Sequence, residues 1–230
     1  MLTLKEMLDN VLLESGMDTE SIYATSTEDS VRRLMRLANR SARRIATGHA
    51  WQALRRTYTF SLTTALEYVL PVDFRELISD TTFVDSYVHG VDMRTRPEQW
   101  RYLQVNVTGT GPRYRMRIMG NVIHVYQPQS GDEISFEYTS DYPVLDTDQE
   151  TTQKLFDADT DTWRLDDDLL EMDIIWRYKK LLGLQDWQVD HAEFKTYDRT
   201  VKGQEAGAKT IYGVDGSEMP NTEPYTDLYI

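Results

Sequence analysis

Apolar residues recur at helical spacing in two segments near the start of the chain. In the first, Leu2 to Glu14, they stand three or four residues apart, and Gly16 follows as a stop signal. In the second, Thr27 is placed to cap a helix that runs to about Thr47, with acidic residues in its first turn. We therefore expect two amphipathic helices within residues 1–54.

Short β-prone runs replace this pattern between residues 55 and 145. The stretch Tyr58–Leu70 predicts a β-hairpin, and the alternation from Tyr114 to Tyr138 predicts a β-meander with one solvated face. Pro71 and Pro97 each open a stretch that predicts a single helical turn. Together these runs predict an inserted antiparallel β-domain, built as a meander, a barrel or a sandwich.

Helical periodicity resumes after an acidic stretch. Residues Asp141–Asp161 are polar and predict a loop, whereas from Asp166 onward apolar residues cover much of the helix circumference. Gly183 interrupts this buried helix, and Trp187 begins a more polar one that ends near residue 202. The order of segments predicts an α+β fold, a helical bundle interrupted by the β-domain.

The last stretch has no periodicity and is rich in glycine and proline, yet it keeps many apolar and aromatic residues. Plain disordered tails seldom contain so many. We predict an extended C-terminal arm that docks on a partner, with a tail packed on its own bundle as the alternative. The predicted anchors are Ile211, Tyr212, Tyr225, Leu228, Tyr229 and Ile230. The chain is thus divided into N-terminal helices (1–54), β-domain (55–145), acidic loop with C-terminal helices (146–202) and arm (203–230).

Charge and composition narrow the function classes. The chain of 230 residues has a net charge of −13, which disfavours tight binding to duplex DNA but suits a wall that DNA slides past. It has no cysteine, so disulfides, thiolate metal sites and a cysteine nucleophile are excluded, as fits assembly in a reducing cytoplasm. We find no signal peptide and no apolar run of about 18 residues, so we expect no membrane partner.

A cluster of basic residues lies on the second predicted helix. Its main members stand three or four residues apart and share one helix face. We expect this face to contact an acidic surface on a neighbouring copy; DNA contact, or a solvated face with pairs inside the chain, are the alternatives. The predicted inter-subunit residues are Arg32, Arg36, Arg40 and Arg43 on one side and Asp166, Asp167, Asp168 and Glu171 on the other.

Catalytic and metal motifs find little support. Asp157, Asp159 and Asp161 resemble the opening of a calcium loop, but Thr162 stands where that loop needs glycine and Asp168 where it needs glutamate. The four histidines are scattered, without the spacing of a metal motif. We expect no enzyme and no cofactor; a metal-dependent hydrolase that uses the acidic cluster is the alternative from another class.

Four segments, in their order along the chain, resemble a known family: Glu67–Phe83, Pro97–Trp100, Arg117–Tyr138 and Leu165–Leu184. They are similar to the head-to-tail adaptor proteins of tailed phages, in particular the tail-tubular-A-like group of podoviruses. The resemblance implies a ring of twelve copies under a dodecameric portal. It also implies a β-domain that faces the next tail component and an arm that reaches the portal.

We therefore expect a structural virion protein at the head–tail junction, assembled in the host cytoplasm. Its expected partners are further copies of itself, the portal protein and a downstream tail or nozzle protein. Viral DNA would pass through the ring without sequence-specific binding. A head-completion connector of a long-tailed phage is the alternative within the same class.

Overall fold

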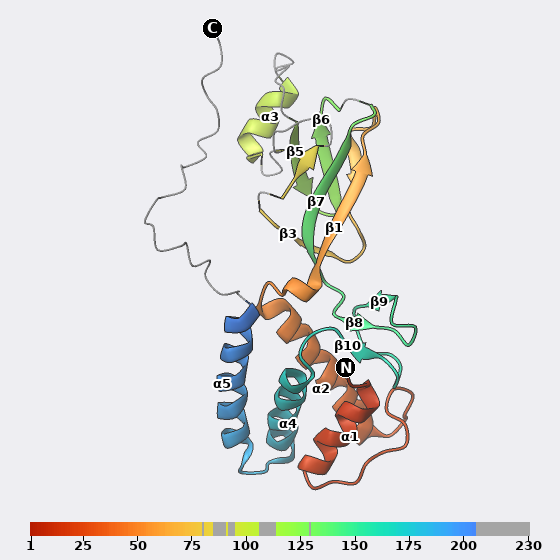
Figure 1. Cartoon of the computed structure of the whole chain (residues 1–230), viewed down its shortest axis with the longest axis vertical. Coiled ribbons are helices and arrows are strands. Elements are labelled where there is room, and N and C mark those ends of the chain that lie inside the picture. The colour runs from red at the N-terminus through yellow and green to blue at the C-terminus, as the bar shows by residue number, and fades with distance from the viewer. Residues whose placement is uncertain (80, 85–90, 92–94, 106–113, 129, 206–230) are drawn as a thin grey trace, which may run out of the picture.

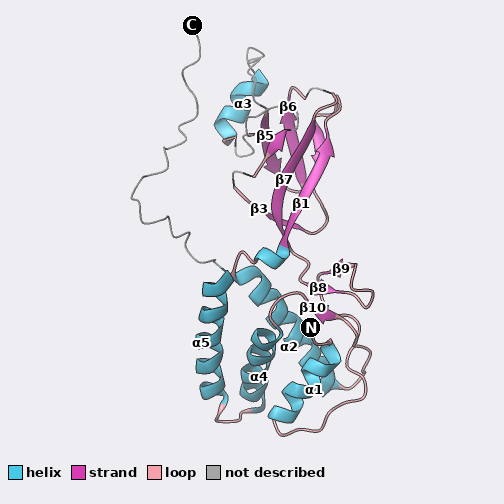
Figure 2. Cartoon of the chain, viewed as in Figure 1, coloured by secondary structure: helices cyan, strands magenta, loops and turns pink. Residues whose placement is uncertain are grey.

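The computed structural model describes residues 1–79, 81–84, 91, 95–105, 114–128 and 130–205. The molecule is elongated, with most helices gathered at one end and most strands at the other (Figures 1 and 2). The described residues form five α-helices and several antiparallel sheets, which confirms the α+β prediction. They group around two separate hydrophobic cores, one in the bundle and one in the β-domain. The exact limits of the four predicted regions stay a prediction.

Four helices build the bundle: α1 (Leu4–Glu14), α2 (Asp29–Gly48), α4 (Asp167–Leu182) and α5 (Trp187–Glu205). The first begins with a capping box, in which Thr3 accepts from the Glu6 N–H and the Glu6 carboxylate accepts from the Thr3 N–H. The second has Glu28 at its N-cap, which makes no side-chain capping hydrogen bond, so the prediction that Thr27 caps it was wrong. At the start of α4 the Asp166 carboxylate accepts from the Leu169 N–H.

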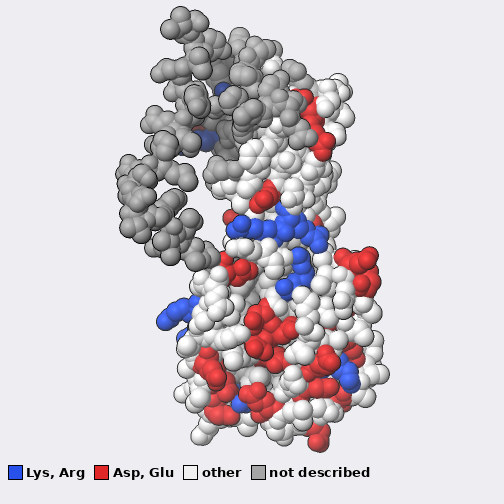
Figure 3. Space-filling view, in the orientation of Figure 1, with Lys and Arg blue, Asp and Glu red and all other residues white. Residues whose placement is uncertain are grey.

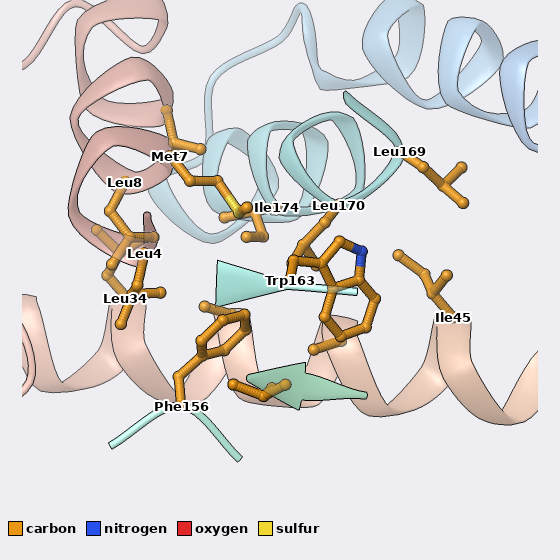
Figure 4. Close-up of a cluster of buried hydrophobic side chains, with 14 of the residues drawn as sticks. Leu4, Met7, Leu8, Leu34, Ile45, Phe156, Trp163, Leu169, Leu170 and Ile174 are labelled. Carbon is orange, nitrogen blue, oxygen red and sulfur yellow. The ribbon is translucent and has the colours of Figure 1, made fainter. Parts of the chain in front are cut away.

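The segment between the β-domain and α4 enters the bundle core. It forms a small sheet in the order β10-β8-β9, from β8 (Val144–Leu145), β9 (Thr152–Gln153) and β10 (Thr162–Trp163). Phe156 and Trp163 are buried, and Figure 4 shows the Trp163 ring among side chains of the helices, with Leu170 and Ile45 close by. Residues 141–161 are mostly loop, as predicted, but they also contain the short strands β8 and β9 and bury Phe156 in the core.

Two sheets that share one core form the β-domain. The first has the order β1-β7-β3 with β4 also paired to β7; the second has the order β2-β6-β5. The strands are β1 (Arg55–Ser61), β2 (Glu67–Val69), β3 (Phe74–Leu77), β4 (Phe83–Val84), β5 (Arg115–Met119), β6 (Val122–Tyr126) and β7 (Glu133–Ser140). Phe60 and Phe136 of the first sheet and Met116 and Ile123 of the second belong to the same buried cluster. Of the three forms left open by the sequence, this is the sandwich.

Strand pairing departs from the predicted hairpin and meander. The strands β1 and β2 lie in different sheets, so the predicted hairpin over 58–70 was wrong. The strands β5 and β6 do form an antiparallel hairpin, but β7 then crosses to the other sheet and the predicted meander ends. After Pro71 the chain makes a single turn, in which the Phe74 N–H donates to the Pro71 carbonyl oxygen at 3.0 Å, but strand β3 then begins at Phe74. From Pro97 the chain forms helix α3 (Pro97–Val105), which is longer than the single turn predicted there.

Candidate assembly surfaces

One face of α2 carries a continuous array of arginines. Its apolar positions, among them Leu34, Ala38 and Ile45, are buried in the bundle. Helix geometry places the arginines within about 120° on the opposite side, and all of them are exposed. We call this surface the arginine face; it consists of Arg32, Arg33, Arg36, Arg40, Arg43 and Arg44.

Most arginines of the arginine face have no ion-pair partner among the described residues. Arg32 lies 4.0 Å from Asp29, and within the described residues the other five arginines form no ion pair. Like charges four residues apart destabilise a helix by about 0.2–0.5 kcal/mol per pair, and Arg32, Arg36, Arg40 and Arg44 form three such pairs. A solvated face bears this small cost, but a carboxylate partner would remove it.

Two of the predicted acidic partners, Asp166 and Asp167, bind other groups of the same chain. Asp166 caps α4 and also accepts a hydrogen bond from the Tyr197 hydroxyl at 3.1 Å. Burial, followed by this contact, raises the pKa of Tyr197 to about 12. Asp167 accepts from the Leu2 N–H at 2.9 Å and lies 3.6 Å from the N-terminal amine. Both carboxylates therefore hold other parts of the bundle together.

The other two predicted partners, Asp168 and Glu171, line a groove of about 220 Å³ on the outer side of α4. We call it the acidic groove; its lining residues are Glu14, Asp168, Glu171, Met172, Ile175, Asp190 and Glu193. Figure 3 shows Asp and Glu side chains gathered over the bundle on one face of the molecule. The sequence did not predict Glu14, Asp190 or Glu193 as part of this surface. They lie on α1 and α5, which come next to α4 only when the chain folds.

The charges in the acidic groove are only partly compensated. Burial raises the pKa of Glu171, as do the charges of neighbouring carboxylates, whereas a hydrogen bond from Asn10 at 2.9 Å lowers it. Asp190 is paired with Lys179 at 3.0 Å. Within the described part of the chain, Glu14, Asp168 and Glu193 form no ion pair. The groove thus offers three open carboxylates around a partly apolar floor.

A third feature, absent from the sequence predictions, is the joint between bundle and β-domain, where Figure 3 shows Lys and Arg side chains gathered. Arg75 of β3 donates to the carbonyl oxygens of Ala46 at 2.7 Å and Thr47 at 2.5 Å, at the C-terminal end of α2. A cation suits this end of a helix, where carbonyl groups are left without partners.

A second arginine, Arg164, also connects the two parts of the molecule at the joint. Arg164 donates to the carbonyl oxygens of Tyr142 and Ala53, at 3.0 and 2.5 Å. Burial lowers the pKa of its guanidinium. These contacts connect the bundle with both chain segments that lead into the β-domain.

Asp73 organises the strand side of the joint. It is buried and accepts hydrogen bonds from the Tyr138 hydroxyl at 2.8 Å, the Ser140 hydroxyl at 2.7 Å and the Arg56 guanidinium at 3.2 Å. Burial, together with the contact to Asp73, raises the pKa of Tyr138 to about 12. The network ties β1 and β7, the two strands that connect to the bundle, to the start of β3.

The family model described as SU10 adaptor protein matches residues 2–212. The chain belongs to the SU10 adaptor protein family. It is accordingly a structural adaptor of phage particles, and its place is the head–tail junction of the virion. No curated protein matches the sequence.

The remaining sequence predictions fall on other parts of this adaptor. The predicted arm anchors lie outside the described residues. In residues 157–161 the carboxylates serve the fold: Asp161 accepts from two backbone N–H groups, and Asp159 accepts from the N–H groups of Tyr23 and Ala24. Among the described residues no three His, Asp or Glu side chains are placed to hold a metal ion, and no helix is both long and apolar enough to cross a membrane.

Proposed function

We propose that this adaptor forms a ring that joins the portal to the downstream tail tube or nozzle and lines the channel for viral DNA. The observation that carries the proposal is the family match, which spans the bundle and the β-domain together. The proposed ring has twelve copies, by resemblance to the podovirus tail-tubular-A-like adaptors, and assembles in the host cytoplasm. The net charge of −13 supports passage of DNA without sequence-specific binding.

The shape of the molecule supports two different neighbours along the ring axis. The bundle and the β-domain lie at opposite ends and have separate cores (Figure 1). The joint of Arg75, Arg164 and Asp73 ties the two ends together. An adaptor that presents one end to each neighbour needs such a fixed connection, because a loose one would let the two contacts move independently.

The arm is proposed to fasten the ring to the portal. Helix α5 ends at the joint, where Glu205 accepts from the Gln52 backbone N–H at 3.1 Å. A chain as long as residues 206–230 can span up to roughly 80 Å. Helix α5, with 19 residues, is roughly 28 Å long, so from the joint a segment of that reach extends past the far end of this helix. Its aromatic and aliphatic residues, such as Tyr225, Leu228 and Tyr229, are suited to fill pockets on a partner.

No observation favours a hydrolase over the adaptor role. Asp166 and Asp167, which that alternative would need, cap α4 and bind the N-terminal segment. A connector of a long-tailed phage would use the same surfaces against another neighbour. The proposal therefore includes no catalytic residue and no cofactor.

Co-sedimentation with portal rings from the same genome tests the proposal. The full-length chain is compared with a chain that ends at Ala206 and with a full-length Tyr225→Ser, Leu228→Ser, Tyr229→Ser variant. We expect only the unaltered chain to travel with the rings. Binding by all three would leave the adaptor role and remove the arm; binding by none, over a range of salt concentrations, would refute the portal contact.

A further inference from the structure

We propose that the arginine face of one copy docks into the acidic groove of the next copy. The inference rests on the proposed ring and names the contact that would build it. The arginine face is an exposed helix face on which, among the described residues, only Arg32 has an ion-pair partner, Asp29. The occupant that its charge selects is a second copy of this chain, whose acidic groove supplies the opposite charge.

The two surfaces point away from each other within one chain. On α4, Leu170 and Ile174 share the buried core with α2, whereas Asp168 and Met172 lie on the other side of the helix and line the groove. On α2, the arginines lie opposite the buried residues. One chain therefore cannot satisfy its own groove with its own arginine face. A contact between two different surfaces on opposite sides is heterologous, and its repetition closes a ring when the rotation fits.

The chemistry of the two surfaces is matched as well as their charge. From Arg32 to Arg44 the arginine face extends for roughly 18 Å along the helix, enough for several guanidinium groups to face the groove at once. The open carboxylates of Glu14, Asp168 and Glu193 surround Met172 and Ile175. Arginine suits such a site because its apolar stem packs on the floor while the planar fork binds carboxylates in pairs.

The strength of exposed ion pairs indicates what this contact would contribute to a ring. A single exposed ion pair contributes little to affinity, so the charges alone do not hold a ring together. Several pairs in one contact instead set the register, exclude wrong orientations and speed association, and they weaken as salt is raised. The rest of the interface has to come from other surfaces, and Leu182, which is exposed, lies on the groove side of α4 about two turns beyond Ile175.

Charge reversal with a swap tests the contact. One variant reverses the arginine face (Arg36→Glu, Arg40→Glu) and another reverses the groove (Glu14→Arg, Glu193→Arg). A third combines all four changes and so keeps the wild-type net charge. The control is Lys195→Glu with Arg199→Glu, two exposed positions on α5 that give the same change in net charge as the reversed arginine face. All four positions of the test are exposed, and circular dichroism verifies that each variant is folded.

Self-association is measured by sedimentation velocity, for the protein alone and on portal rings. We expect each single-surface reversal to weaken self-association at least about tenfold. We expect the equimolar mixture of the two reversals, and also the swapped chain, to restore it, and the control to behave as wild type.

Three results would overturn the inference: both reversals assemble as wild type does, the swapped chain shows no recovery, or the wild-type chain never self-associates. If wild type assembles and the reversals and the swapped chain behave as expected, but wild type does not bind portal rings, the proposed function fails and the contact stands. If it binds portal and the reversals change nothing, the contact fails and the adaptor role stands.

Discussion

Removing the Asp73 carboxylate is the most direct test of the joint. In Asp73→Ala the hydroxyls of Tyr138 and Ser140 lose their acceptor, and both residues are buried. A buried polar group left without a partner costs about 1–3 kcal/mol. Arg56 adds little, because its side chain is 35% exposed and also binds the Thr152 hydroxyl. We therefore expect a loss of about 3 kcal/mol in the free energy of unfolding.

Urea unfolding followed by tryptophan fluorescence measures this loss, and a thermal scan should show a fall of about 6–12 °C for a chain of this size. Asp73→Asn keeps an acceptor and the side-chain volume, so it should cost about 1–2 kcal/mol. The control is Asp18→Ala, at an exposed position, which should stay within about 0.5 kcal/mol of wild type. A loss below about 1 kcal/mol in Asp73→Ala would refute the reasoning, since it would mean that the two hydroxyls are satisfied without the carboxylate.

Three further predictions concern the bundle and its connection to the β-domain. Trp163→Ala should cost about 3–5 kcal/mol in urea unfolding, because the ring is fully buried, whereas Trp163→Phe should cost about 1 kcal/mol. Arg75→Met should cost about 1–2 kcal/mol and speed proteolysis at residues 48–54, since it removes the two hydrogen bonds at the end of α2; unchanged cleavage would contradict this. Burial raises the pKa of Asp161 above its ordinary 3.8, so the folded state holds that proton more tightly than the unfolded chain, and stability should fall as pH rises from 3.8 toward neutral. In Asp161→Asn the urea midpoint should fall less over that range than in wild type; an equal fall would assign the pH dependence to other groups.

The helices could be predicted because their signals are local. Asp166 stands where it caps α4, and Gly183 ends that helix at a φ of 78°, a backbone conformation that favours glycine. Strand pairing could not be predicted in the same way. Tyr58 pairs with Phe136, far along the chain, because burial of Phe60 and Ile134 between two sheets outweighs the tendency of neighbouring strands to pair.

Among the candidate surfaces, too, those formed by one segment can be predicted from the sequence and those formed by several segments cannot. The arginine face follows from spacing on a single helix, so the sequence shows it directly. The acidic groove draws Glu14, Asp168 and Glu193 from three helices, and only the packing of those helices brings them together. At the joint Arg75 binds backbone carbonyls, a partner that leaves no mark in the sequence.

The joint and the proposed contact between copies place complementary demands on the subunit. The arginine face and the acidic groove both lie on the bundle, so repeated docking would set the position of each bundle in a ring but would leave the β-domains free. A tail component that binds a ring must meet all β-domains in one arrangement, because one displaced copy breaks the cyclic symmetry of the contact. The joint transmits the position of the bundle to the β-domain through Arg75, Arg164 and Asp73. It follows that a variant with a weakened joint, such as Asp73→Asn, should still self-associate through its bundle while presenting a less uniform surface to the tail. Reversal of the arginine face should have the opposite effect, with intact subunits that do not assemble.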